Sequence, residues 1–194
     1  MGKGRLEAFS DGVIAILITI MVLDLKVPEG AQFRSLMPLI PVFLNYALSF
    51  VYLGIYWNNH HHLLHTSERV TGGILWANLH LLFWLSLIPV TTAWMSENHQ
   101  DAAPSALYGA DLVMAAIAYF ILEQLIIASQ GHGSLLKRAI GRDRKGKLSP
   151  VLYLCGIAAA FWSPPLSQAI YVLVALIWLV PDRRIEGVLA SAKD

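Results

Sequence analysis

The sequence predicts an all-α integral membrane protein with six transmembrane helices in a single domain, residues 1–194. Its 194 residues are 56% hydrophobic and only 14% charged, whereas about 25% of the residues in an ordinary soluble domain are charged. The mean hydropathy is +0.56, and apolar segments alternate with short polar breaks along the whole chain. The single cysteine, Cys155, supplies neither a disulfide framework nor a Cys-based zinc site.

Six apolar segments are expected to be helical, and we predict spans at residues 5–26, 36–65, 74–95, 106–129, 150–162 and 166–180. A helix needs roughly 20 residues to cross a bilayer, so the last two spans are short. Pro38 and Pro41 fall in the first turns of the second span, where the N–H that proline lacks would be unpaired anyway. Glu7 and Asp11 precede the first apolar run, which therefore resembles a retained helix more than a signal peptide.

The distribution of basic residues predicts the orientation in the cell membrane. With six spans, twelve Lys and Arg residues lie on the side of both termini, whereas Lys26 and Arg34 lie on the other side. The twelve are Lys3, Arg5, Arg69, Lys137, Arg138, Arg142, Arg144, Lys145, Lys147, Arg183, Arg184 and Lys193. Because cytoplasmic loops carry the excess of basic residues, both termini are expected in the cytoplasm.

The first helix brings an ionisable side chain into the membrane. Its apolar run has only eleven residues, 13–23, so Ser10 and Asp11 must enter or approach the apolar layer. Polar residues at the same expected depth on the other helices are Asn58, Asn59, His60, His61, His62, Asn78, His80, Glu123 and Gln124. Unpaired polar groups in hydrocarbon are costly, so we expect these residues to satisfy one another across helix interfaces.

Helical phase divides the first helix into two faces, at about 100° per residue. One face carries Phe9, Gly12, Ile16, Thr19, Ile20 and Leu23, and the other carries Asp11, Ile18 and Val22. If Asp11 faces its own bundle, the Ile/Thr/Leu stripe faces lipid, another subunit or a pore.

The first helix also carries a recognisable motif. Arg5, Phe9, Ser10 and Asp11 form RxxxFSD ahead of an Ile/Thr/Leu-rich span, and the segments at residues 57–61 and 78–89 support the same resemblance. The chain resembles the bacterial members of the transmembrane protein 175 family of potassium channels. The resemblance implies a homotetramer in which the first helix of each subunit lines a central pore.

The resemblance also implies a role for each motif residue. By this resemblance, Ile16 would form the narrowest hydrophobic constriction and Thr19 the hydroxyl ring that favours potassium. Ile20 and Leu23 would be further constricting positions. Residues of the packing and gating network behind the pore would be Arg5, Phe9, Ser10, Asp11, Trp57, His61 and Asn78. The expected activity is a channel modestly selective for potassium over sodium, in which potassium is the permeant ion and neither a cofactor nor catalysis is needed. The sequence has no TVGYG-like carbonyl filter and no helix with Arg at every third position, so no voltage sensor is indicated.

Two other classes of function stay open at this point. A membrane metal enzyme could use the histidine cluster at residues 60–65, because His61 and His65 have the i, i+4 spacing of two ligands on one helix face. Against this, the chain has only one such cluster. A proton-coupled transporter could use Asp11, Asp111 or Glu123.

Overall fold

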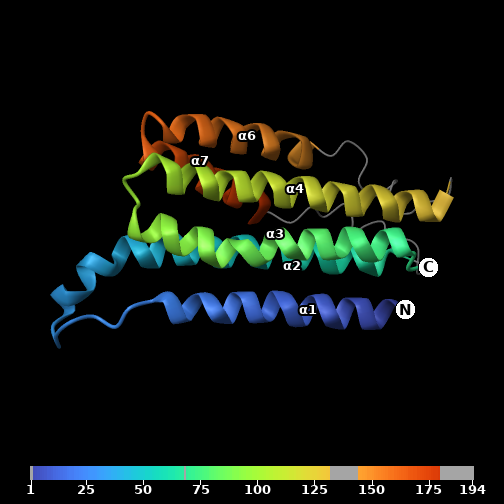
Figure 1. Cartoon of the computed structure of the whole chain (residues 1–194), viewed down its shortest axis with the longest axis horizontal. Coiled ribbons are helices and arrows are strands. Elements are labelled where there is room, and N and C mark those ends of the chain that lie inside the picture. The colour runs from blue at the N-terminus through green and yellow to red at the C-terminus, as the bar shows by residue number, and fades with distance from the viewer. Residues whose placement is uncertain (1, 68, 132–143, 180–194) are drawn as a thin grey trace.

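A computed structural model describes residues 2–67, 69–131 and 144–179, and all the regular structure in them is helical. The helices run side by side along the long axis of an elongated bundle (Figure 1). Chain direction alternates from each α-helix to the next, and the N-terminus lies at the same end of the bundle as the end of the second helix. The predicted all-α fold is confirmed.

Helix α1 comprises Lys3–Ile20 and continues as the 3-10 helix η1, Met21–Asp24. Its buried side chains are Leu6, Ser10, Ile14 and Leu17, at the spacing of three and four residues that marks one helix face. That face packs on the second and third α-helices. The predicted span at residues 5–26 overlaps this pair of helices and is displaced from it by two residues at each end.

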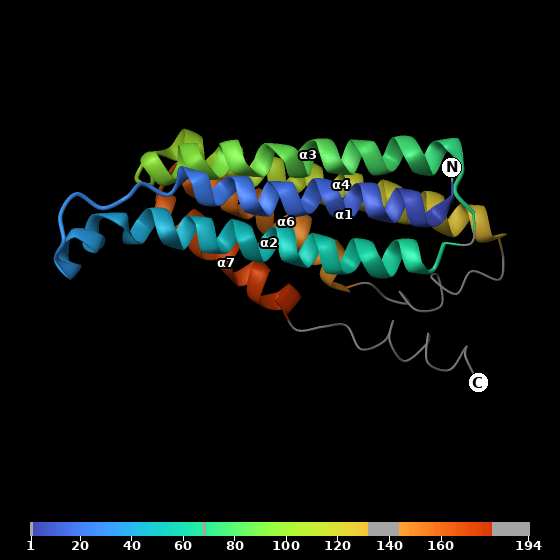
Figure 2. The same cartoon turned by 90° about the horizontal axis from the view of Figure 1, so that it is seen from below.

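The second predicted span, residues 36–65, forms two elements. The 3-10 helix η2, Phe33–Leu39, precedes α2, Ile40–His65. Pro41 lies in the first turn of α2, where its missing N–H leaves no hydrogen bond unmade. Figure 2 shows η2 extending beyond the end of the bundle.

Helices α3, Gly72–Glu97, and α4, Ala102–Gln130, form the centre of the bundle. The side chain of Thr71 caps α3 by accepting a hydrogen bond from the amide of Ile74 at 3.3 Å. Both helices are longer than the predicted spans at residues 74–95 and 106–129. Four segments of the described chain are long and apolar enough to cross a membrane: Lys3–Asp24, Phe33–His65, Gly72–Glu97 and Ala102–Gln130.

Two shorter helices complete the described chain. They are α6, Arg144–Ala160, with 17 residues, and α7, Pro164–Leu179, with 16. They overlap the predicted spans at residues 150–162 and 166–180, of which residue 180 lies outside the described residues, but α6 begins six residues earlier than the predicted span. Tyr171 of α7 packs against Gly109 and Gly156, where an added Cβ would come within 2.0 Å and 2.4 Å of its side chain. Small residues therefore allow α4, α6 and α7 to approach closely.

The exposed face of α3 indicates where the membrane lies. Trp76, Phe83, Val90 and Trp94 are exposed along this helix. The two tryptophans are 18 residues apart, about 27 Å at 1.5 Å per residue, close to the roughly 30 Å of a hydrocarbon core. Tryptophan is enriched at both membrane interfaces, so Trp76 and Trp94 mark the two edges of the apolar layer.

Candidate functional site

The predicted stripe on α1 is an uncovered surface in the isolated chain. Ile16 is 59% exposed and Leu23 is 79% exposed, and Phe9 and Ile20 are each nearly half exposed. Thr19 is exposed among them. An apolar helix face of this length, interrupted by one hydroxyl, is available to contact lipid, another subunit or an aqueous path.

The Thr19 hydroxyl has a defined orientation on this stripe. Its Oγ1 lies 3.1 Å from the carbonyl oxygen of Ala15 and 3.0 Å from that of Ile16, so the hydroxyl proton is donated within the helix. The lone pairs of the oxygen then remain available on the exposed side. An oxygen in this state can accept from water or coordinate a cation.

Behind the stripe, a hydrogen-bonded relay joins three helices. Asn78 of α3 donates from Nδ2 to Oγ of Ser10 at 3.0 Å, and Ser10 donates to the carbonyl oxygen of Leu6 at 2.9 Å. The Oδ1 of Asn78 lies 2.6 Å from Nε2 of His60. Because that oxygen can only accept, Nε2 of His60 carries a proton. All three side chains are buried, so the relay fixes α1, α2 and α3 at one depth.

The histidine in this relay is not the predicted one. His61 was expected in the network together with Asn78, but it lies on the exposed side of α2, where its ring stacks on Trp57 and His65. His60 is only 1% exposed and takes that place. The reason is helical phase, since consecutive residues differ by about 100° and only one of them can face α3.

Asp11 has a partner of its own. Its Oδ1 accepts a hydrogen bond from Nε1 of Trp57 at 3.0 Å, and the carboxylate is half-buried. This contact joins α1 to α2 beside the relay. The structure thus brings the predicted residues Ser10, Asp11, Trp57 and Asn78 together in two adjacent contacts.

Arg5 and Phe9, which were predicted in the same network, lie apart from these contacts. Both are exposed on the same face of α1 as Ile16 and not behind it. Within the described chain, the guanidinium of Arg5 makes no hydrogen bond or ion pair. Within the described residues, Arg5 therefore takes no part in the contacts that hold Ser10 and Asp11 behind the stripe.

A second polar layer lies near the opposite edge of the membrane and was not predicted. Oγ of Ser49 lies 2.6 Å from Oγ1 of Thr92 and 3.0 Å from the hydroxyl of Tyr108. Thr91, next to Thr92 in α3, donates to Oδ2 of Asp111 at 3.1 Å. The sequence signal was the pair Thr91 and Thr92 close to Trp94, together with Asp111 inside an apolar helix.

The histidines of residues 60–65 do not form one set of ligands. His60 faces Asn78, whereas His61 and His65 stack on the outside of α2. Over residues 2–67, 69–131 and 144–179, no group of three His, Cys, Asp or Glu side chains is arranged to hold a metal ion.

The fold and this site define a helical membrane protein whose first helix leaves an apolar face uncovered and is fixed from behind by buried hydrogen bonds. Residues 5–89 match the family described as "Endosomal/lysosomal potassium channel TMEM175". A protein of Chryseobacterium sp. (strain P1-3) described as a potassium channel is 59% identical over 186 residues, covering 96% of this chain and 97% of its own length. A Streptomyces collinus potassium channel is 29% identical, with 91% of each chain covered.

A solved structure supports the same relationship. The crystal structure of a lysosomal potassium-selective channel TMEM175 homologue from Chamaesiphon minutus matches with a TM-score of 0.81 and 27% identity. The match covers 93% of this chain and 97% of that one. The chain belongs to the TMEM175 family, as the motif on its first helix predicted.

Proposed function

We propose that the protein is a potassium-conducting cation channel of the cell membrane, in which four identical subunits surround a central pore lined by α1. The observation that carries this proposal is the exposed stripe of α1, Phe9 to Leu23, in a chain of the TMEM175 family. An apolar face that is interrupted by a hydroxyl and backed by a buried polar relay suits a pore better than a lipid contact. Lipid contact would need neither the hydroxyl nor the relay.

Conduction in this proposal is controlled by hydrophobic side chains. A ring of four Ile16 side chains closes the pore by dewetting, and Ile20 and Leu23 narrow it further toward the outer end. A small rotation of α1 would widen the ring and allow water and cations to pass. The Thr19 oxygens, whose protons are donated within the helix, face the ion and give a modest preference for potassium over sodium.

The network behind α1 sets the rotation of the pore helix. Ser10 holds α1 against α3 through Asn78, and Asp11 holds it against α2 through Trp57. These contacts support the gate and do not touch the ion. The channel needs no cofactor and performs no chemical reaction, and both termini face the cytoplasm.

Ion flux into proteoliposomes that contain the purified protein tests this proposal. Under a potassium gradient we expect downhill flux that exceeds the flux in a matched sodium gradient and persists when the proton gradient is collapsed. Protein-free liposomes and protein inactivated by heat are the controls. Flux that strictly requires a proton gradient would instead support a proton-coupled transporter, for which Asp111 is the first residue to test, because its Oδ1 is buried without a hydrogen-bond partner among the described residues.

A further inference from the structure

Resting on the proposed pore, we infer that Arg5 forms a ring of positive charge at the cytoplasmic mouth and makes the channel conduct potassium better inward than outward. Arg5 is 11 residues from Ile16 in the sequence, which at about 100° per residue leaves the two side chains only about 20° apart around the axis of α1. It is also about 16 Å further toward the cytoplasmic end, at 1.5 Å per residue. The side chain that faces the pore mouth is therefore a cation.

No other charged side chain of α1 shares this face. By the same phase, Lys3, Glu7 and Asp11 lie about 140° to 180° from Ile16. Lys3 donates from Nζ to the carbonyl oxygen of His65 on α2, and Asp11 accepts from Trp57, as this phase requires. Nothing on the pore side of α1 offsets the charge of Arg5.

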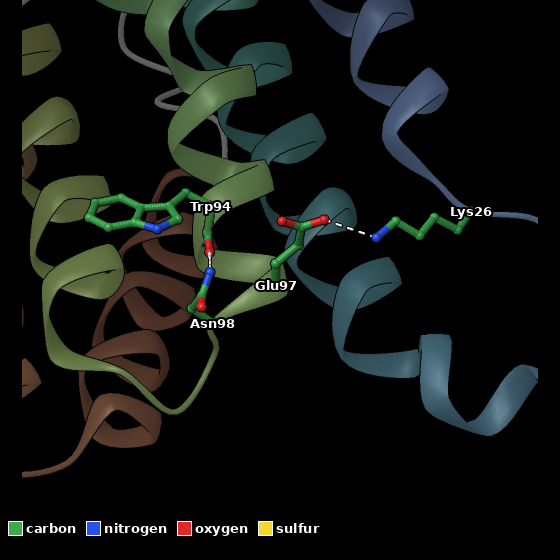
Figure 3. A network of polar contacts seen from close by, with 4 residues as sticks. All are labelled: Lys26, Trp94, Glu97 and Asn98. Atoms are coloured by element: carbon green, nitrogen blue, oxygen red, sulfur yellow. Dashed lines mark hydrogen bonds and ion pairs between the residues drawn. The ribbon is translucent and has the colours of Figure 1, made fainter.

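The outer end of the same helix is different. Its basic residue, Lys26, reaches across to Glu97 at the end of α3, with Nζ and Oε1 2.9 Å apart (Figure 3). The two charges cancel, although the pair is exposed and contributes little to stability. Asp24, next to the most exposed residue of the stripe, is itself exposed, so a negative charge lies beside the outer end of the stripe.

This asymmetry of charge affects the supply of ions to the two mouths. A local potential of about one kT lowers the concentration of a monovalent cation by about 2.7-fold at the cytoplasmic mouth, whereas Asp24 raises it outside. Outward current is carried by cations that enter the pore from the cytoplasmic mouth, where their concentration is lowered. Inward current should therefore exceed outward current by about twofold to threefold in symmetrical 20 mM potassium, where the Debye length is roughly 20 Å, and the difference should vanish near 1 M, where it is about 3 Å.

Current–voltage curves from inside-out patches in symmetrical potassium test the inference. Arg5→Gln should bring the ratio of inward to outward current close to one at 20 mM, and Arg5→Lys should keep the ratio of the unmodified protein. Lys3→Gln is the matched control, because it removes the same charge two residues away on the opposite face of α1. If Lys3→Gln changes the ratio as much as Arg5→Gln does, the effect comes from general surface charge and the inference is wrong.

A chemical version of the experiment avoids dependence on folding of the variant. Arg5→Cys in a Cys155→Ser background can be modified after assembly with a cationic or an anionic methanethiosulfonate reagent. The cationic reagent should restore inward rectification, and the anionic reagent should reverse it. Equal currents with both reagents would overturn the inference while leaving the channel itself established, whereas the absence of any potassium current in the unmodified protein would overturn the proposed function.

Discussion

Replacing Asn78, the one asparagine of α3, should destabilise the bundle far more than replacing Asn98, which follows that helix. Asn78→Ala removes two interhelical hydrogen bonds and leaves the buried N–H of His60 without its acceptor. Interhelical hydrogen bonds in membranes contribute about 0.6 kcal/mol each, and an orphaned buried donor costs about 1–3 kcal/mol. The free energy of unfolding should therefore fall by about 2–4 kcal/mol.

The assay is reversible unfolding in a titration with sodium dodecyl sulfate, followed by circular dichroism. Asn98→Ala is the matched control, since Asn98 follows the same helix, is only half-buried, and its side chain donates only to the carbonyl oxygen of Trp94 at 3.1 Å (Figure 3). This control should cost less than about 0.5 kcal/mol.

A second set of variants tests the relay as a unit. The triple variant Ser10→Ala, His60→Phe and Asn78→Leu removes every polar partner together. It should cost less than the sum of the three single changes, because replacing both members of a buried pair by apolar groups avoids the desolvation penalty. Strict additivity, or an Asn78→Ala variant as stable as Asn98→Ala, would refute the relay.

Three further predictions concern the pore and the packing. Ile16→Asn should raise potassium flux into proteoliposomes about tenfold or more by hydrating the constriction, and unchanged flux would remove Ile16 from the gate. Thr19→Val, which keeps the shape and removes the oxygen, should reduce the ratio of potassium to sodium permeability measured from reversal potentials, whereas Thr19→Ser should preserve it; equal ratios would exclude the hydroxyl ring. Gly109→Ala should destabilise the protein by about 1–3 kcal/mol, because its Cβ would meet Tyr171 at 2.0 Å. Gly54→Ala, with nothing within 4 Å of the new Cβ, should be neutral in the same unfolding assay, and equal losses would contradict the packing.

Helical phase predicted the exposed face of α1 but only part of the opposite face, since Val22, which it grouped with Asp11, is 46% exposed. The residues that it grouped with Ile16 are exposed, and Ser10 is buried on the other side. The same phase, when it is extended to Arg5, places this residue on the face of Ile16, whereas the motif predicted that Arg5 belongs to a network behind the stripe. Arg5 is exposed in the folded chain, which agrees with the face predicted by helical phase and not with a position behind the stripe.

The phase of α2 could not be predicted in the same way. Its sequence is apolar on every side, because lipid and the bundle interior both favour apolar residues. Three consecutive histidines therefore gave three possible registers, and the burial of Tyr52, Tyr56 and His60 at four-residue spacing decides among them. A spacing argument based on these tyrosines would have selected His60.

The outer polar layer was missed for a related reason. Serine and threonine are tolerated in apolar helices because their hydroxyls can bond to the backbone of the preceding turn, as Thr92 does to Ile88, and tyrosine is tolerated because most of its side chain is apolar. Their presence in the sequence therefore does not reveal whether they also meet across helices. The contact of Ser49 with Thr92 and Tyr108 depends on three helices and appears only in the folded chain.

The most direct test of a pore lined by α1 is block by cadmium ions of a channel with Ile16→Cys in a Cys155→Ser background. Four thiolates around a narrow pore bind Cd²⁺ tightly, so potassium current should disappear at micromolar cadmium and return with a chelator. Ile18→Cys is the control, since Ile18 lies about 160° from Ile16 and packs against the core of its own subunit. Current through Ile16→Cys channels that cadmium leaves unchanged, or block of the Ile18→Cys variant instead, would contradict a central pore on this face of α1.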